Sequence, residues 1–145
     1  MTKSFREYQF RIVETALFYN TMVCLPTGLG KTFIAATVML NYYRWFPRGK
    51  IYFLAPTKPL VTQQKDAITC LKSVNQEDIV EITGGVTKKK RHDLYYEKRM
   101  FFMTPQTLEN DLEGGLVDSK DIVLVIFGMV FPFLFTILCR NFKSS

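Results

Sequence analysis

The sequence is poor in the residues that build metal sites and support thiol chemistry. Its 145 residues include one histidine, His92, and three widely spaced cysteines, Cys24, Cys70 and Cys139. An odd number of distant cysteines predicts neither a disulfide framework nor a zinc site made of paired cysteines, and this usage is typical of a reducing compartment. A single histidine argues against a histidine-based metal centre or nucleophile, so we expect His92 to be a solvated surface residue.

The length and the N-terminal residues set further limits. Residues 1–7 contain no apolar run, so the sequence predicts no secretory signal there. A chain of 145 residues is long enough to bury a core, but it is too short for two nucleotide-binding domains of about 100–200 residues each. With 48% apolar and 22% charged residues, the composition favours one globular domain and argues against disorder.

Positive charge is concentrated in one segment of the chain. There are 19 basic and 13 acidic residues, a net charge of +6, and residues 86–99 alone contain six basic residues against Asp93 and Glu97. Such a segment is typical of a nucleic-acid-binding surface or a nuclear-import patch, and equally of a solvated helix face. Its basic residues are Lys88, Lys89, Lys90, Arg91, Lys98 and Arg99.

Short apolar strands alternate with helical patterns along most of the chain. This alternation is typical of an α/β fold with a parallel sheet and helices on both faces. In such folds ligands bind at the carboxyl ends of the strands, and the polar motifs described next follow those ends. Strands are expected at residues 21–25, 50–55, 78–83, 99–104 and 121–127, and helices at 5–19, 31–45, 60–71, 87–98 and 108–112.

A glycine-containing turn at residues 26–30 links the first strand to the next helix. The segment Leu25-Pro26-Thr27-Gly28-Leu29-Gly30-Lys31-Thr32 has the arrangement of a phosphate-binding P-loop, with leucine where the general pattern begins with glycine. Its glycines allow backbone amides to turn toward phosphate oxygens, and the helix N-terminus adds a positive dipole end. In this arrangement Lys31 reaches the β- and γ-phosphates of ATP, and Thr32 offers its hydroxyl to Mg²⁺.

The P-loop resembles motif I of the superfamily 2 helicases, and four other segments resemble further sequence elements of these helicases. The segment Phe5-Arg6-Glu7-Tyr8-Gln9 resembles the element upstream of motif I, in which the Gln9 amide is expected to read the adenine edge. Three strand-end segments resemble the loops by which these helicases hold the phosphate backbone of one nucleic-acid strand, a contact that hydroxyls and exposed amides suit. They are Pro56-Thr57-Lys58, Thr83-Gly84-Gly85 and Thr104-Pro105-Gln106.

Longer strings of residues are similar to the Fanconi anaemia group M family, which includes archaeal Hef and the fungal Mph-type DNA helicases. These strings are residues 25–36, 55–61 and 101–112, and the resemblance extends over about residues 4–127. It implies a RecA-like domain that uses ATP and Mg²⁺ in a 3′–5′ DNA translocase. It also implies remodelling of forks, D-loops and Holliday junctions in recombination repair, a nuclear location and histone-fold partner proteins.

The pattern of this family stops at Gly128. In the family the strand at 121–127 leads into Asp-Glu-Ala-His, whose first two residues hold Mg²⁺ and position the attacking water, but no carboxylate follows Gly128 here. Asp121 lies at the other end of the strand, roughly 20 Å away, and does not substitute. Since phosphoryl transfer depends on metal-borne charge and an oriented nucleophile, we expect weak nucleotide binding, negligible turnover and a partial RecA-like domain over residues 1–127.

Residues 128–145 are expected to form a divergent apolar tail. Residues 122–139 contain no charge over 18 residues, and as a helix of ~27 Å this segment nears the length that spans a bilayer. The alternatives are a strand followed by an apolar tail without a partner, a membrane helix, which Pro132 disfavours, and a tail that packs elsewhere in the fold. The abrupt change at Gly128 suggests the hypothesis of a truncated gene model, a retained intron or a frameshift.

Three functional hypotheses follow from these observations. The leading one is the N-terminal ATP-binding half of a DNA-repair helicase that acts on branched DNA. The alternatives are a non-catalytic nucleic-acid-binding or dominant-interfering fragment, and a small membrane-tethered P-loop protein. ATPase assays with and without branched DNA separate the first two hypotheses, and extraction from membranes tests the third.

Overall fold

The computed structural model describes residues 21–24, 28–70, 74–128 and 134–139. The predicted helix at 5–19 lies outside these described residues. Up to residue 128, strands and helices alternate as predicted within them. They are β1 (Thr21–Cys24), α2 (Gly28–Trp45), β2 (Lys50–Leu54), α3 (Lys58–Thr69), β3 (Ile79–Glu81), α4 (Lys88–Glu97), β4 (Met100–Met103), α5 (Pro105–Glu113), β5 (Ile122–Gly128) and β6 (Leu134–Cys139), with short 3₁₀ helices at Gln76–Asp78 and Ser119–Asp121.

Three helices begin earlier than the sequence pattern predicts. α2 begins at Gly28, so the predicted turn at 26–30 is wrong for its last three residues. α3 begins at Lys58 instead of residue 60, and α5 begins at Pro105 instead of residue 108. In α3 and α5 the first turn contains a proline, which is well tolerated there because the amides have no intrahelical acceptor. Apolar periodicity does not mark such a first turn, and the helices therefore extend closer to the strands that precede them.

One six-stranded sheet runs through the molecule in the order β1-β6-β5-β2-β4-β3. β2 pairs in parallel with both β4 and β5, and β3 pairs in parallel with β4. β6 runs antiparallel to both of its neighbours, β1 and β5, so β1 points in the same direction as β2 to β5. The expected parallel arrangement is confirmed for β1 to β5, but the sheet as a whole is mixed because of β6.

β6 comes from the segment that carries no family pattern. Its register pairs Ile137 with Ile126 and Leu134 with Cys24, and the Ile137 side chain has no solvent-exposed surface. Of the three alternatives for the tail, packing within the fold is the one observed for Leu134–Cys139. Apolar and β-branched residues suit a strand between two neighbours, and no helix in the described part of the chain is long and apolar enough to cross a membrane.

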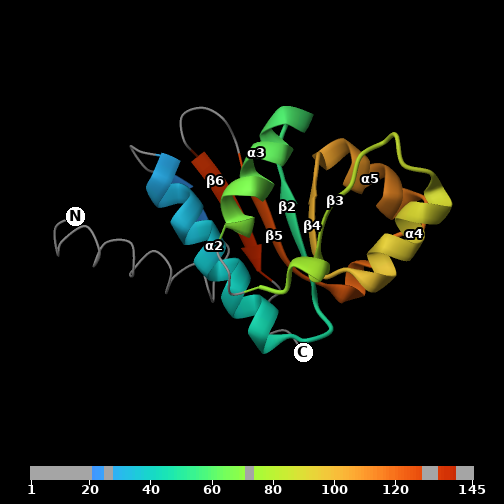
Figure 1. Cartoon of the computed structure of the whole chain (residues 1–145), viewed down its shortest axis with the longest axis horizontal. Coiled ribbons are helices and arrows are strands. Elements are labelled where there is room, and N and C mark those ends of the chain that lie inside the picture. The colour runs from blue at the N-terminus through green and yellow to red at the C-terminus, as the bar shows by residue number, and fades with distance from the viewer. Residues whose placement is uncertain (1–20, 25–27, 71–73, 129–133, 140–145) are drawn as a thin grey trace, which may run out of the picture.

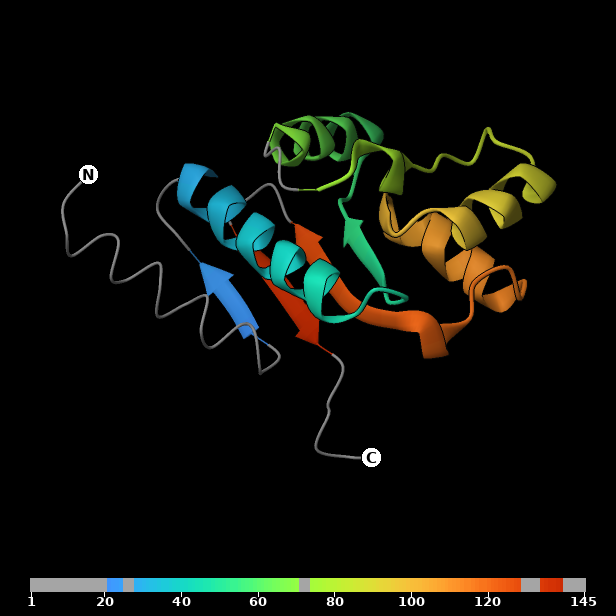
Figure 2. The same ribbon diagram turned by 60° about the horizontal axis from the view of Figure 1, so that its bottom comes forward.

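The helices form a layer on each face of the sheet. α2 packs across β2, β5 and β6, and α3 packs across β3 and β4, whereas α4 and α5 lie together on the opposite face (Figures 1 and 2). Because each of the four described α-helices follows a parallel strand, all of them begin at the edge where β1 to β5 end. We call this the carboxyl edge; its strands end at Cys24, Leu54, Glu81, Met103 and Gly128.

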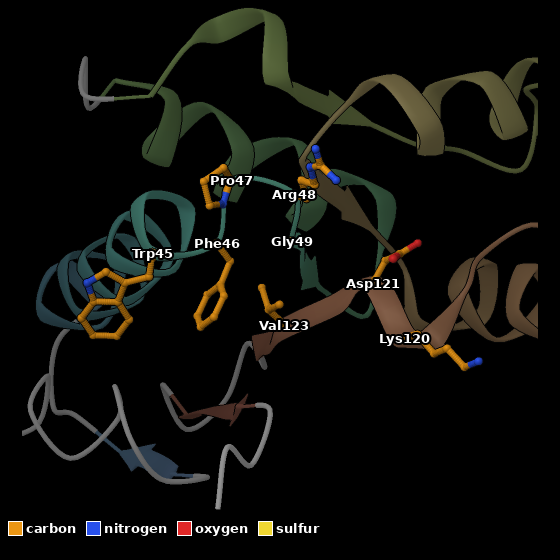
Figure 3. Close-up of a pocket in the computed structure, with 8 residues that line it drawn as sticks. All are labelled: Trp45, Phe46, Pro47, Arg48, Gly49, Lys120, Asp121 and Val123. Atoms are coloured by element: carbon orange, nitrogen blue, oxygen red, sulfur yellow. The ribbon is translucent and has the colours of Figure 1, made fainter. Parts of the chain in front are cut away.

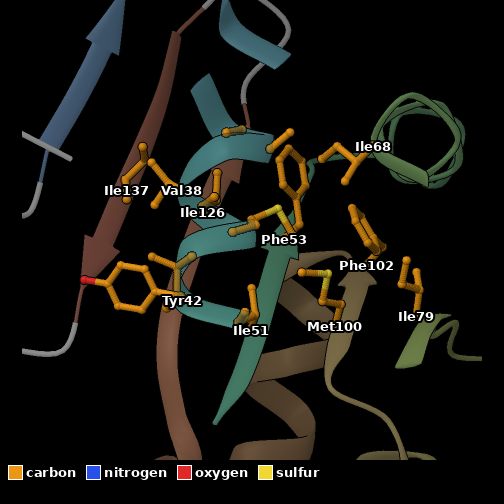
Figure 4. Close-up of a cluster of buried hydrophobic side chains, with 14 of the residues drawn as sticks. Val38, Tyr42, Ile51, Phe53, Ile68, Ile79, Met100, Phe102, Ile126 and Ile137 are labelled. Atoms are coloured by element: carbon orange, nitrogen blue, oxygen red, sulfur yellow. The ribbon is translucent and has the colours of Figure 1, made fainter. Parts of the chain in front are cut away.

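Side chains alternate between the two faces and form two hydrophobic cores. On β2, Ile51 and Phe53 pack against the α2 and α3 layer, whereas Tyr52 and Leu54 pack against the α4 and α5 layer. The first core includes the stacked rings of Phe53 and Phe102, whose centroids are 5.5 Å apart (Figure 4). Alternation with a period of two requires cover on both sides of a strand. The prediction of helices on both faces is therefore confirmed.

Candidate functional site

The predicted phosphate loop lies between β1 and α2 at the carboxyl edge. β1 ends at Cys24 and α2 begins at Gly28, with no acidic residue in the first turn of the helix. The first amides of a helix have no intrahelical acceptor and form a positive dipole end, which suits a phosphate group. The strand and helix that the P-loop prediction requires on either side of the turn are therefore present.

Part of the predicted nucleotide site belongs to the start of α2. The residues in its first two turns include Gly28, Leu29, Gly30, Lys31 and Thr32. The remaining predicted nucleotide-site residues, Gln9, Leu25, Pro26 and Thr27, lie outside the described residues. The backbone thus puts Lys31 and Thr32 next to the carboxyl edge, and their contacts with ATP and Mg²⁺ stay predictions.

The segment Pro56-Thr57-Lys58 joins β2 to α3 and is exposed. Thr57 precedes α3 in an extended conformation, and its side chain makes no capping hydrogen bond to the helix. Lys58 is the first residue of α3. A threonine hydroxyl, a lysine and uncapped amides at a helix N-terminus are donors that suit a phosphate oxygen. The first predicted nucleic-acid segment is therefore an exposed strand-end turn.

The segment Thr83-Gly84-Gly85 lies between β3 and α4. Gly84 and Gly85 are exposed, and a Cβ atom added to Gly84 would meet nothing within 4 Å. A Cβ atom added to Gly85 would meet the Thr83 hydroxyl at 3.9 Å, an ordinary contact, and neither glycine has a positive φ. Neither backbone conformation nor internal packing requires glycine here. A ligand that approaches the exposed backbone closely would be a physical reason for glycine at these two positions.

The segment Thr104-Pro105-Gln106 joins β4 to α5. Thr104 precedes α5, and its hydroxyl lies 3.0 Å from that of Thr107. Gln106 is exposed, and its Nε2 donates to Asn110 Oδ1 over 3.3 Å. Both contacts stay within the first two turns of α5. They hold polar side chains at the helix N-terminus, which is the part of the helix that lies at the carboxyl edge.

The register of the sheet brings these three segments side by side. Leu54 pairs with Met103, and Glu81 pairs with Phe102. Adjacent strands lie about 4.8 Å apart, so the ends of β2, β4 and β3 span about 10 Å. Thr104-Pro105-Gln106 lies between the other two segments, although it comes last in the sequence. The start of α2 lies on the same edge, beyond β5 and β6.

A buried ion pair joins α4 to α5. Arg91 Nε and Nη2 donate to the two carboxylate oxygens of Asp111, over 3.0 and 2.9 Å. Tyr95 also donates to Asp111, over 2.6 Å, and burial, followed by this hydrogen bond, raises the pKa of Tyr95. Arg91 Nη1 donates to the Val86 carbonyl over 2.5 Å. The network therefore fixes the turn after Gly85 relative to α5.

Neither member of this ion pair is singled out by a sequence motif. Arg91 belongs to the basic segment, but it is buried at 8% exposure, and Asp111 is buried at 2%. Asp111 lies three residues after Leu108, on the face of α5 that packs inward. A carboxylate at a buried helix position is rare unless it is paired. The position of Asp111 on the apolar face of a helix is therefore the sequence signal that could have indicated a buried, paired carboxylate.

β5 ends at Gly128, where the resemblance predicts an aspartate. A Cβ atom at this position would lie 3.2 Å from the Phe53 ring, a tight contact. Asp121 precedes β5 at the opposite edge of the sheet. Among the described residues no group of three His, Cys, Asp or Glu side chains could hold a metal ion. The chain therefore offers Mg²⁺ the predicted Thr32 hydroxyl and no carboxylate at the end of β5.

A pocket of about 420 Å³ opens at the edge of the sheet opposite to the motifs (Figure 3). None of the predicted nucleotide or nucleic-acid residues lines it, so it is separate from the candidate site. Its lining consists of Trp45, Phe46, Pro47, Arg48, Gly49, Lys120, Asp121 and Val123.

Comparison with known proteins identifies the family. A family model described as "Type III restriction enzyme, res subunit" matches residues 2–127. The chain is 50% identical over 121 residues to the Fanconi anemia group M protein of Gallus gallus, which covers 83% of this chain. It is also 50% identical over 123 residues, or 85% of this chain, to ATP-dependent DNA helicase fml1 of Schizosaccharomyces pombe. The chain belongs to the superfamily 2 helicases of the Fanconi anaemia group M type.

Solved structures agree with this helicase family. The helicase domain of Pyrococcus furiosus Hef matches with a TM-score of 0.77 and 36% identity, over 83% of this chain and 26% of that chain. A DEAD box protein from Methanococcus jannaschii, at 22% identity and a TM-score of 0.66 over 83% of this chain and 33% of that one, shares the fold. The expected RecA-like fold is confirmed. The chain spans 6% and 15% of the two curated relatives.

Proposed function

We propose that this chain binds ATP and the phosphate backbone of a DNA strand at the carboxyl edge, and that it hydrolyses ATP negligibly. One observation carries the proposal: the shared direction of β1 to β5 puts the α2 N-terminus and the three polar segments on one edge. One relative is named an ATP-dependent DNA helicase, and this name supports both ATP and DNA as ligands. In this proposal residues 1–127 supply the ATP-binding part of a larger motor.

The nucleotide would bind against the start of α2. Backbone amides from Gly28 onward would contact phosphate oxygens, and Lys31 would add a positive charge at the β- and γ-phosphates. Gln9 would read the adenine edge, because its amide group both donates and accepts hydrogen bonds. Thr32 would be the protein ligand of a Mg²⁺ ion, which supplies charge neutralisation to the phosphates when it is bound.

The three strand-end segments would hold DNA along the ends of β2, β4 and β3. Hydroxyls, exposed amides and helix N-termini contact phosphate oxygens and carry no base readout, so this surface suits DNA of many sequences. For the longer protein we extend the proposal to the properties that the family resemblance implies. These are 3′–5′ translocation, remodelling of forks, D-loops and Holliday junctions in DNA repair, a nuclear location and histone-fold partners.

Negligible turnover is proposed because of the residues that follow the end of β5. Hydrolysis needs metal-borne charge and a positioned water molecule. Gly128 has no side chain, residues 129–145 contain no carboxylate, and β6 returns into the sheet beside β1. The same observation favours a second candidate role, in which the chain interferes with an intact helicase because it occupies the same DNA without moving along it.

Titration with a fluorescent ATP analogue tests the nucleotide site. We expect Lys31→Ala to weaken binding at least about tenfold, because a charged hydrogen bond to phosphate is lost. Lys120→Ala removes an exposed lysine at the opposite edge and is expected to leave binding unchanged. Equal affinities of the two variants would refute the position of the phosphate loop. A steady-state ATPase assay tests the proposed lack of hydrolysis. Turnover stimulated by branched DNA would refute it.

A further inference from the structure

Three consecutive lysines form an exposed surface in the first turn of α4. Lys88, Lys89 and Lys90 are exposed, and within the described part of the chain none of them forms an ion pair. The next residue, Arg91, is buried in its ion pair with Asp111. Three charges of this run therefore face solvent and the fourth does not. We call Lys88–Lys90 the lysine patch.

The lysine patch lies where positive charge is unfavourable for the helix. The N-terminus of a helix is the positive end of its dipole, so cations in the first turn destabilise it, and α4 has no acidic residue there to compensate. Thr87 Oγ1 accepts from the Lys90 amide over 3.3 Å, and the Arg91–Asp111 pair ties α4 to α5. These contacts hold the helix despite the repulsion. A bound anion would neutralise both the lysines and the helix N-terminus.

The patch is tied to one of the proposed DNA-binding segments. It begins three residues after Gly85, in the helix that follows β3, and β3 is the outermost strand on this side of the sheet. Figure 1 shows α4 at the end of the molecule farthest from α2. The hydrogen bond from Arg91 to the Val86 carbonyl fixes the patch to the Thr83–Gly85 segment. A DNA strand bound to the Thr83–Gly85 segment would therefore lie close to the lysines.

We propose that the lysine patch binds the phosphates of the DNA where it leaves the three strand-end segments. This inference rests on the proposed function and adds a fourth contact to it, outside the helicase motifs. Lysines are flexible point charges, which suit phosphate contacts that do not depend on sequence. A nuclear-import receptor that reads four successive basic side chains would also need Arg91, which is buried, so the folded chain favours DNA.

The salt dependence of DNA binding tests the lysine patch. The variant Lys88→Gln/Lys89→Gln/Lys90→Gln removes the patch, and the control Arg44→Gln/Arg48→Gln/Lys120→Gln removes three exposed charges from the other end of the sheet. With fluorescent single-stranded DNA, we expect the slope of log K against log salt to decrease in magnitude by about 2 in the patch variant, since each phosphate contact contributes about 0.7. The control variant is expected to keep the wild-type slope.

Thermal stability separates a binding role from a structural one. The patch variant loses an unfavourable charge cluster, so its melting temperature is expected to stay or rise while its DNA affinity falls at least about tenfold at 0.1 M salt. Equal slopes for the patch and control variants would overturn the proposed DNA contact of the lysine patch and leave the proposed function intact. Wild-type protein that does not bind DNA would overturn both.

Discussion

At the residue scale, the glycines of this chain meet different structural requirements. Gly115 has a φ of 76°, in the left-handed region where a side chain is strained. Gly84 has no positive φ, and an added Cβ atom would have no neighbour within 4 Å. A methyl group at Gly84 would therefore leave the fold unchanged and would meet a ligand that approaches from outside.

The substitutions Gly84→Ala and Gly115→Ala form a matched pair. Gly84→Ala is expected to change the free energy of unfolding by less than about 0.5 kcal/mol and to weaken binding of single-stranded DNA severalfold, because the methyl group keeps a phosphate away from the backbone. Gly115→Ala is expected to lower the free energy of unfolding by about 1–2 kcal/mol with unchanged DNA affinity. Urea unfolding and fluorescence anisotropy measure the two quantities. Wild-type DNA affinity in Gly84→Ala would contradict DNA contact at this turn.

At the scale of secondary-structure elements, α4 and α5 form one unit because both depend on Asp111. Its carboxylate accepts hydrogen bonds from Arg91 and Tyr95 of α4. Its backbone carbonyl accepts from the amides of Leu116 and Val117, at 2.9 and 3.3 Å, in the turn after α5. One residue therefore holds together two helices whose first turns follow two of the proposed DNA-binding segments.

Asp111→Ala is expected to lower the free energy of unfolding by about 3–5 kcal/mol, because the Arg91 guanidinium would stay buried without its charge partner. Tyr95→Phe removes one hydrogen bond and is expected to cost about 1 kcal/mol. The double variant Arg91→Met/Asp111→Leu removes both charges and is expected to recover most of the loss. Urea unfolding of the three variants measures these effects. An Asp111→Ala protein as stable as Tyr95→Phe would contradict a strongly coupled buried pair.

Elements with a local signal were predictable from the sequence, and contacts between distant residues were not. Apolar runs and the prolines and glycines between them predicted β2, β4 and α3 to within two residues at each end. The ion pair joins residues 20 positions apart, and a basic run gives no sign that Arg91 turns inward. Motif spacing predicted the strand-end segments. Their order across the sheet depends on strand pairing, which no local pattern contains.

At the scale of the whole molecule, β6 connects the strand of the phosphate loop to the rest of the sheet. Within the described part of the chain, β1 pairs with β6 alone, through pairs such as Thr21 with Ile137. Apolar and β-branched side chains favour a strand, but the partner and direction of β6 depend on residues far away in the sequence. The tail without a family motif thereby supports the position of the candidate nucleotide site.

The substitutions Ile137→Ala and Leu138→Ala test this support on adjacent residues of β6. Ile137 is fully buried in the α2 layer, whereas Leu138 is 44% exposed. Ile137→Ala is expected to lower the free energy of unfolding by about 2–5 kcal/mol because it leaves a cavity, and Leu138→Ala by about 1 kcal/mol or less. Nucleotide affinity is expected to fall with Ile137→Ala alone, since β1 leads into the phosphate loop. Equal, small losses of stability in urea unfolding would show that β6 does not lie between β1 and β5.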